Sequence, residues 1–235
     1  MNYFLLFGGQ SNMEGAGAAS FIGQEPAGIP HSGIRYAGRT IDGDIPLGDL
    51  RVHPDASHRF GPELQCGLDF YNAGRTSLTI AKGARGGQPM RMFLPTTLGF
   101  TGTYFDFMKG AVMRALSAKS GPTTCYFVWN QGEAETIEAT ETNALLWATN
   151  YNILHGIVEG WFGQTVPKII CRTSIGYHAI IGDAQWMGTV RGLQEDTADH
   201  LIDTDDFTFQ ADDSHYLPAL NNTLGSRISG VLLAL

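Results

Sequence analysis

Two short polar segments of this chain hold residue types that can carry out acyl transfer. Ser11 lies within Gly-Gly-Gln-Ser-Asn at 8–12, directly after an apolar run, and Asp212 stands three residues before His215. A serine hydroxyl can attack a carbonyl carbon when a histidine accepts its proton. A carboxylate on the other ring nitrogen fixes the tautomer of that histidine and stabilises the imidazolium that forms. These residue types predict Ser11 as nucleophile, His215 as general base and Asp212 as the orienting acid.

Neither segment is specific when it stands alone. A serine between glutamine and asparagine is also a common helix cap. An aspartate three residues before a histidine also occurs as an ordinary surface pair. The elements that would bring the two segments together must decide between these interpretations.

Apolar runs alternate with amphipathic segments along the chain. Apolar and β-branched runs predict strands at 3–7, 76–81, 124–129, 168–173 and 200–203. Apolar residues at intervals of three and four predict helices at 104–119, 146–161, 183–199 and 217–235. Strands that alternate with helices indicate a parallel sheet covered on both faces. We expect an α/β fold, a three-layer α/β/α sandwich with about five mostly parallel strands and flavodoxin-like winding, as a single domain over 1–235.

The carboxyl ends of these strands lead into polar or glycine-rich segments. These are 8–12, 82–87, 130–133, Ser174 and 212–215. Ligands bind beyond the carboxyl ends of strands in open parallel sheets, so we expect these segments to meet at one edge. The stretch 24–62 is rich in Gly and Pro and has little periodicity. Long irregular loops are uncommon unless they are functional, and we expect this one to lie over the site.

The charge balance excludes some partners. The 235 residues carry a net charge of −8 and no run rich in Lys or Arg. Nucleic acids and anionic membranes attract basic patches, so we expect neither as a partner. A neutral sugar or a small ester suits this balance better, and the oligomeric state stays open.

The sequence contains no clear pattern for a metal site, a cofactor site or a set of disulfides. The three cysteines are widely spaced and odd in number, which favours buried free thiols. His53, Asp55 and His58 have no third imidazole nearby, so we expect no metal site. The glycines at 83, 86 and 87 do not form a phosphate-binding loop, and we expect no cofactor.

Targeting signals are also weak. The first residues lack the basic and long apolar segments of a signal peptide, and no run approaches the length of a membrane span. By default we expect a cytoplasmic protein, with virion association or secretion of a trimmed form left open.

Several motifs follow one another along nearly the whole chain. They are GQSNMEG at 9–15, FGPEL at 60–64, KGARGG at 82–87, NQGEAE at 130–135, VRGLQ at 190–194, DDSHY at 212–216 and LGSR at 224–227. In this order they resemble the SGNH hydrolase superfamily. More narrowly, they resemble its carbohydrate acetylesterase branch, which includes acetylxylan esterases and sialate O-acetylesterase-like domains.

The resemblance implies a set of catalytic residues. Ser11 would be the nucleophile, His215 the general base and Asp212 the residue that orients the histidine. The oxyanion hole would use the backbone N–H groups of Ser11 and Gly61 and the side-chain amide of Gln131. The glycines before Ser11 would let the chain turn so that its hydroxyl projects at the edge of the sheet.

Further residues of the matched motifs are candidates for substrate binding. We expect Gln10, Asn12, Arg85 and Glu133 to contact substrate. For Glu133, support of the histidine and simple bracing of the loop stay open as alternatives.

The chain departs from the family pattern near this glutamate. The superfamily usually has Gly-x-Asn-Asp in this block, where this chain has Gln-Gly-Glu. The branch often continues with a small residue and Asp, whereas Ala134 and Glu135 stand here. Arg191 in VRGLQ is expected to form a structural ion pair rather than to act on substrate.

The resulting hypothesis is a serine esterase that removes O-acetyl groups from a carbohydrate through an acyl-serine intermediate. An esterase for small aryl or lipid esters would use the same triad. A non-catalytic carbohydrate-binding or virion-associated module should have lost Ser11 or His215, and both are present. An α/β-hydrolase would carry Gly-x-Ser-x-Gly near mid-chain, but Met13 occupies the second glycine position here.

Overall fold

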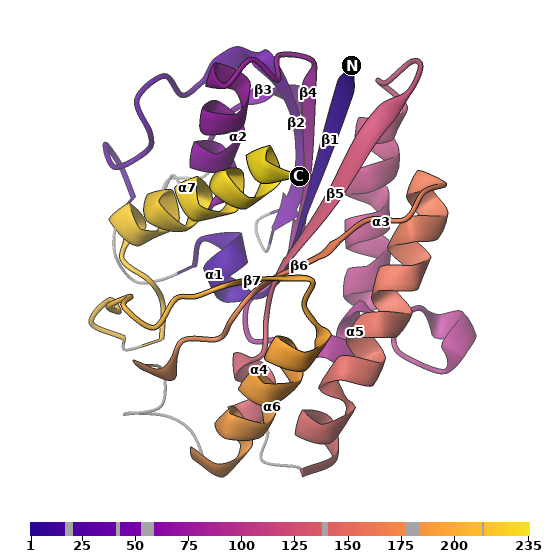
Figure 1. Ribbon diagram of the computed structural model, residues 1–235, viewed down its shortest axis with the longest axis vertical. Coiled ribbons are helices and arrows are strands. Elements are labelled where there is room, and N and C mark those ends of the chain that lie inside the picture. The colour runs from indigo at the N-terminus through magenta and orange to yellow at the C-terminus, as the bar shows by residue number, and fades with distance from the viewer. Residues whose placement is uncertain (17–20, 41–42, 53–58, 138–140, 177–183, 213) are drawn as a thin grey trace.

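The computed structural model describes residues 1–235 apart from 17–20, 41–42, 53–58, 138–140, 177–183 and 213 (Figure 1). The strands are β1 (Asn2–Gly9), β2 (His31–Thr40), β3 (Gly43–Leu50), β4 (Leu78–Ala84), β5 (Thr123–Asn130), β6 (Lys168–Cys171) and β7 (His200–Ile202). Across the described residues they form one seven-stranded sheet in the order β3-β2-β4-β1-β5-β6-β7. Every neighbouring pair is parallel except β2 and β3.

Helices cover both faces of this sheet. They are α1 (Ser11–Glu14), α2 (Glu63–Asn72), α3 (Thr103–Leu116), α4 (Glu133–Ile137), α5 (Glu141–Phe162), α6 (Ala184–Thr197) and α7 (Pro218–Ala234), with 3₁₀ turns η1 (Met90–Phe93) and η2 (Thr96–Leu98). Figure 1 shows α1, α2 and α7 on one side of the sheet and α3 and α5 on the other. Within the described parts of the chain, no helix combines the length and the apolar character that crossing a membrane requires.

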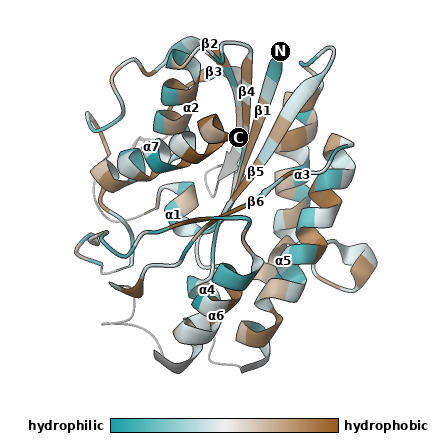
Figure 2. Cartoon of the chain, in the orientation of Figure 1, coloured by the Kyte–Doolittle hydropathy of each residue, from teal (hydrophilic) through white to brown (hydrophobic). Residues whose placement is uncertain are grey.

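The central strand β1 divides the core into two layers. Tyr3, Leu5 and Phe7 belong to a buried cluster with α2 and α7. Phe4 and Leu6 belong to a second cluster with α3 and α5. This division follows from the period of two along a strand, because successive side chains point to opposite faces. In Figure 2 the helices carry alternating brown and teal bands, as expected for helices that bury one side.

The predicted fold class is confirmed, and five of the strands match the prediction. The five predicted strands correspond, in sequence order, to β1, β4, β5, β6 and β7. In the sheet they lie in the order β4-β1-β5-β6-β7, so the second predicted strand precedes the first and the others follow in turn. That is the expected flavodoxin-like winding. The predicted helices correspond to α3, α5, α6 and α7, whereas α2 and α4 were not predicted.

The predicted number of about five strands is wrong. Two more strands, β2 and β3, lie within the stretch 24–62 that was expected to be a loop over the site. Their glycines and Pro46 weaken the strand pattern. Proline is nevertheless tolerated in an edge strand, and β3 pairs only with β2. Hydrogen bonding of β2 to β4 therefore supplies the order that local sequence does not show.

The prediction of free, buried thiols is confirmed. Cys66, Cys125 and Cys171 are all buried and none forms a disulfide.

Candidate active site

The turn after β1 depends on Gly9. Gly9 has φ +142°, and a Cβ at this position would lie 2.0 Å from the backbone oxygen of Asn130. Only glycine fits both the conformation and the close approach. Gly9 pairs with Ala84 at the end of β4 and with Asn130 at the end of β5. The turn therefore starts α1, and with it Ser11, at the carboxyl edge between two neighbouring strands.

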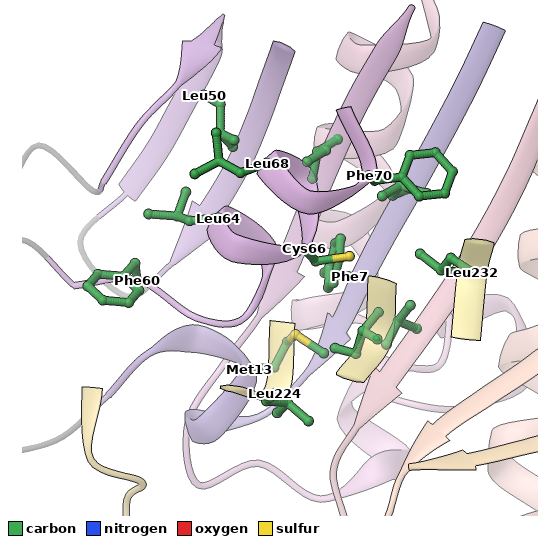
Figure 3. Close-up of a cluster of buried hydrophobic side chains, with 14 of the residues drawn as sticks. Phe7, Met13, Leu50, Phe60, Leu64, Cys66, Leu68, Phe70, Leu224 and Leu232 are labelled. Carbon is green, nitrogen blue, oxygen red and sulfur yellow. The ribbon is translucent and has the colours of Figure 1, made fainter. Parts of the chain in front are cut away.

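Helix α1 is a single turn of four residues and needs tertiary contacts to persist. Met13 supplies an apolar anchor, because its side chain is fully buried in the cluster of α2 and α7. Figure 3 shows it among Phe7, Cys66 and Leu224, which come from β1, α2 and α7. Ser11 itself is 7% exposed, at the opposite end of the same turn.

The predicted acid and base contact each other. The Nδ1 atom of His215 lies 2.9 Å from Oδ2 of Asp212. The backbone N–H groups of Ser214 and His215 each donate to Oδ1 of Asp212 at 3.1 Å. Partial burial opposes the effect, but the hydrogen bonds from the ring and the two N–H groups lower the pKa of Asp212. Asp212 therefore stays ionised near neutrality and accepts a hydrogen bond from Nδ1–H.

Asn12 ties this pair to the serine turn. Its Oδ1 accepts the backbone N–H of Tyr216 at 2.9 Å, and its Nδ2 donates to the backbone oxygen of Ser214 at 3.5 Å. The two residues that flank His215 are thus bound to the residue that follows Ser11. The same Nδ2 donates to Oε1 of Glu133 at 3.1 Å. A single asparagine thus binds two segments that lie 121 and 204 residues further along the chain.

The other polar residues around Ser11 bind further strand ends. Oε1 of Gln10 accepts the backbone N–H of Ala134 at 3.3 Å, after β5. Oε2 of Glu14 accepts the backbone N–H of Gly86 at 2.8 Å, after β4. Gly86 also lies against the nucleophile turn, because a Cβ at that position would come within 3.2 Å of Cβ of Ser11. The side chains of Gln10, Asn12 and Glu14 in the motif GQSNMEG therefore bind the segments around Ser11 and hold the serine turn in place.

The segment after β5 is buried and closely bonded. Nε1 of Trp147 donates to Oε1 of Gln131 at 2.9 Å, and Nε2 of Gln131 donates to the backbone oxygen of Gln88 at 3.3 Å and to Glu135. Burial raises the pKa of Glu133 despite opposing hydrogen bonds and the nearby His215. Burial also raises the pKa of Glu135 to about 8.

This arrangement has the parts that hydrolysis of an ester needs. A serine at the start of a helical turn is held beside a segment whose histidine is bound to an ionised carboxylate. Since the carboxylate can only accept, Nδ1 carries a proton and Nε2 has the lone pair. Such an imidazole can take the proton of a serine hydroxyl.

One known protein family accounts for almost the whole chain. The model described as "Carbohydrate esterase, sialic acid-specific acetylesterase" matches residues 1–234. The chain belongs to this family. The prediction of a carbohydrate acetylesterase, a hydrolase that acts on ester bonds, is thereby confirmed.

Solved structures share the fold of this esterase. A protein from Arabidopsis thaliana is 15% identical, with a TM-score of 0.77 over 99% of this chain and 98% of that one. A carbohydrate acetylesterase from Xanthomonas citri is 16% identical, with a TM-score of 0.67 over 96% of this chain but 55% of that one. A lipolytic G-D-S-L family member from Veillonella parvula is 10% identical, with a TM-score of 0.56 over 99% and 100%. No curated protein sequence matched.

Two of the expected oxyanion donors already have acceptors in the esterase. The N–H of Gly61 donates to Oε1 of Glu63 at 3.3 Å. The side-chain amide of Gln131 donates to the backbone oxygen of Gln88 and to Glu135, so an oxyanion would have to replace one of them. The N–H of Ser11 opens α1, where a helix offers no internal acceptor.

The expected substrate-binding residues divide into two kinds. Gln10, Asn12 and Glu133 are 3%, 2% and 1% exposed, and their side chains bind the protein. Arg85 is only half-buried, after β4, and its guanidinium lies 5.9 Å from the centre of the Tyr104 ring. Of the four, Arg85 is the one whose side chain is not almost fully buried, and its backbone N–H donates to the backbone oxygen of Gly9, beside the serine turn.

The contact between Gly86 and Glu14 is a feature of the site that local sequence does not reveal. The signal was present, because KGARGG follows a strand and GQSNMEG includes the glutamate, but the contact between them joins residues 72 positions apart. Arg191 binds both carboxylate oxygens of Asp205 at 2.7 and 2.8 Å, which confirms the expected structural ion pair.

Among the residues that the structure describes, no group of three or more His, Cys, Asp or Glu side chains is arranged to hold a metal ion. The expectation for His53, Asp55 and His58 concerns residues outside the described ones.

Proposed function

We propose that this carbohydrate esterase removes O-acetyl groups from a sugar with Ser11 as nucleophile and His215 as base. The observation that carries the proposal is the pair of bonds from Asn12 to Ser214 and Tyr216. They hold the histidine segment beside the serine turn, while Asp212 holds the ring from the other side at 2.9 Å.

The reaction then has two halves. Oγ of Ser11 attacks the acetyl carbon while Nε2 of His215 takes its proton, and the tetrahedral intermediate expels the sugar hydroxyl, which receives that proton. The acetyl group is left on Ser11. His215 next removes a proton from water, the water oxygen attacks the acetyl-serine, and acetate leaves as Oγ recovers a proton.

Negative charge on the carbonyl oxygen is stabilised by hydrogen-bond donors in both halves. The backbone N–H of Ser11 is the donor that we assign first. Gly61 and Gln131 act as further donors if their bonds to Glu63 and Glu135 give way in the complex. Arg85, stacked over Tyr104, offers a cation and an aromatic face to the sugar.

Replacement of the nucleophile tests this proposal. Ser11→Ala should reduce turnover of an acetyl ester by roughly 10³-fold or more with the fold intact, since the triad acts as a unit. A folded Ser11→Ala protein that keeps a tenth of the activity would overturn the assignment.

The substrate is tested with matched ester series. The wild-type enzyme should turn over acetylated polysaccharides faster than acetyl, butyryl and octanoyl aryl esters. Preference for octanoyl esters over every acetylated sugar would make the chain a lipid esterase instead.

A further inference from the structure

A lysine and a glutamate form an ion pair in the interior, directly beneath the nucleophile turn. Nζ of Lys82 lies 2.8 Å from Oε1 of Glu63, and each side chain is 2% exposed. Lys82 belongs to β4 and Glu63 opens α2. They lie in the motifs KGARGG and FGPEL, and the catalytic scheme gives neither of them a role.

The partners of this pair lead to the serine turn. Nζ of Lys82 also donates to the backbone oxygen of Glu14, the last residue of α1, at 2.9 Å. Oε1 of Glu63 accepts the N–H of Gly61 at 3.3 Å and the hydroxyl of Tyr36 at 3.5 Å. The pair therefore fastens the end of α1 to the segment before α2 and to two strands of the sheet.

Stability alone does not account for such a pair. Two charges lose their hydration on burial, and replacing both by apolar side chains of similar size is often neutral or stabilising. Lys82 shares one face of β4 with Ile80 and Ala84, which belong to the buried cluster of α2 and α7, so apolar side chains suit this place. What apolar side chains would not replace is the bond from Nζ to Glu14, which fixes the end of α1.

We propose that Lys82 and Glu63 are positioning residues that set the placement of α1 and thereby of the Ser11 hydroxyl. The inference rests on the proposed function, in which that hydroxyl attacks the acetyl carbon. A displacement of a reacting group by about an ångström can cost on the order of 100-fold in rate. The pair acts on turnover through α1 and does not touch substrate.

The test replaces the whole pair. In Lys82→Met/Glu63→Met no charge is left unpaired, so we expect a folded protein with unchanged or higher thermal stability. We expect kcat for an acetyl ester to fall roughly 10–100-fold with little change in KM. The rate at which a serine-directed phosphonate inactivates the enzyme should fall by a similar factor, since it uses the same hydroxyl without the sugar.

Controls separate positioning from general weakening. Arg227→Met removes bonds to Asp206 and to the backbone oxygen of Asp203, an ion pair on α7 that does not reach α1. It should lower thermal stability and leave kcat unchanged. If the double variant does not fold, Glu63→Gln keeps an acceptor at Oε1 and should lower kcat by roughly 3–10-fold.

The outcomes distinguish this inference from the proposed function. A folded double variant, or Glu63→Gln, with kcat within twofold of wild type would overturn the positioning role. A rise in KM alone would also overturn it. Ser11→Ala, measured alongside, decides the proposed function separately: full activity there refutes the nucleophile, whatever the pair does.

Discussion

Two acidic segments approach His215, and they differ in how their charge is held. Asp212 is partly exposed, accepts bonds from two backbone N–H groups and the ring, and has a lowered pKa. Glu133 and Glu135, after β5, are buried, and burial raises the pKa of both. The same functional group thus stands in two environments that favour opposite protonation states.

This difference separates two roles. An acid that orients a histidine must be ionised and aligned with one ring nitrogen, as Asp212 is. A buried carboxyl group that accepts hydrogen bonds from neighbouring amide groups holds a loop in place. Glu135 does so for Gln131 and for the backbone N–H of Met90. We therefore expect the two segments to respond differently to replacement of a carboxyl by an amide.

The largest effect is expected at Asp212. Asp212→Asn can present an N–H to the ring and so stabilise the wrong tautomer, and kcat should fall by roughly 10²–10⁴-fold with the fold intact. Steady-state kinetics on one acetyl ester measure this. Asp206→Asn, on the surface beside Arg227, is the matched control and should leave kcat unchanged. Wild-type kcat in folded Asp212→Asn would remove Asp212 from the mechanism.

Asn12 joins the two segments, and its removal should have the next largest effect. Asn12→Ala leaves the N–H of Tyr216 and Oε1 of Glu133 without this partner. We expect kcat to fall roughly 10–100-fold and the free energy of unfolding to fall by about 1–3 kcal/mol. Kinetics and denaturant titration give both values. Asn222→Ala, whose side chain binds the backbone oxygen of Gln24, serves as control. Equal kcat in the two variants would contradict this role of Asn12.

Glu133→Gln should have a smaller effect than either. The amide oxygen can still accept from Nδ2 of Asn12, so we expect kcat within about tenfold of wild type, with a higher KM if substrate reaches this residue. Measurements at saturating and limiting ester separate the two parameters. If Glu133→Gln abolishes turnover while Asp212→Asn stays near wild type, the acid that orients His215 is Glu133.

The smallest effect on activity is expected at Glu135, where stability should change with pH instead. The folded state keeps the proton of Glu135 up to about pH 8, against 4.5 for the ordinary group. Because the folded state binds more protons between these values, the wild type loses stability as pH rises through them. Glu135→Gln cannot ionise, so its unfolding free energy relative to wild type should rise by about 4 kcal/mol from pH 5 to pH 9. A constant difference across that range would contradict the raised pKa.

The sequence predicted what local pattern can encode. The continuous apolar run of β1 predicted a strand buried on both faces, and the β-branched residues of β4 predicted a second strand. The winding followed from the alternation of such strands with helices. The edge strand β3 and its neighbour β2 were not predicted, because glycines and Pro46 interrupt their sequences. β2 pairs with β4 and β3 pairs with β2, and no local pattern displays this long-range pairing.

The site shows the same limit. Asp212 and His215 are three residues apart, so their contact could be predicted from spacing. Gln10 and Asn12 were expected to meet substrate, yet their partners within the protein lie 124 and 204 residues away. Only the folded sheet brings those partners together, and motif order alone does not distinguish a residue that holds the serine turn in place from one that binds substrate.

The central claim, that Ser11 is the nucleophile, is tested most directly by covalent labelling. The enzyme would be treated with a serine-directed phosphonate, digested and mapped by mass spectrometry, with Ser11→Ala treated in parallel. We predict one phosphonate per chain, on the peptide that contains Ser11, a rate of labelling that matches the loss of acetylesterase activity, and no adduct in Ser11→Ala. An adduct on a different serine that accompanies inactivation, or inactivation of Ser11→Ala at the wild-type rate, would contradict the account.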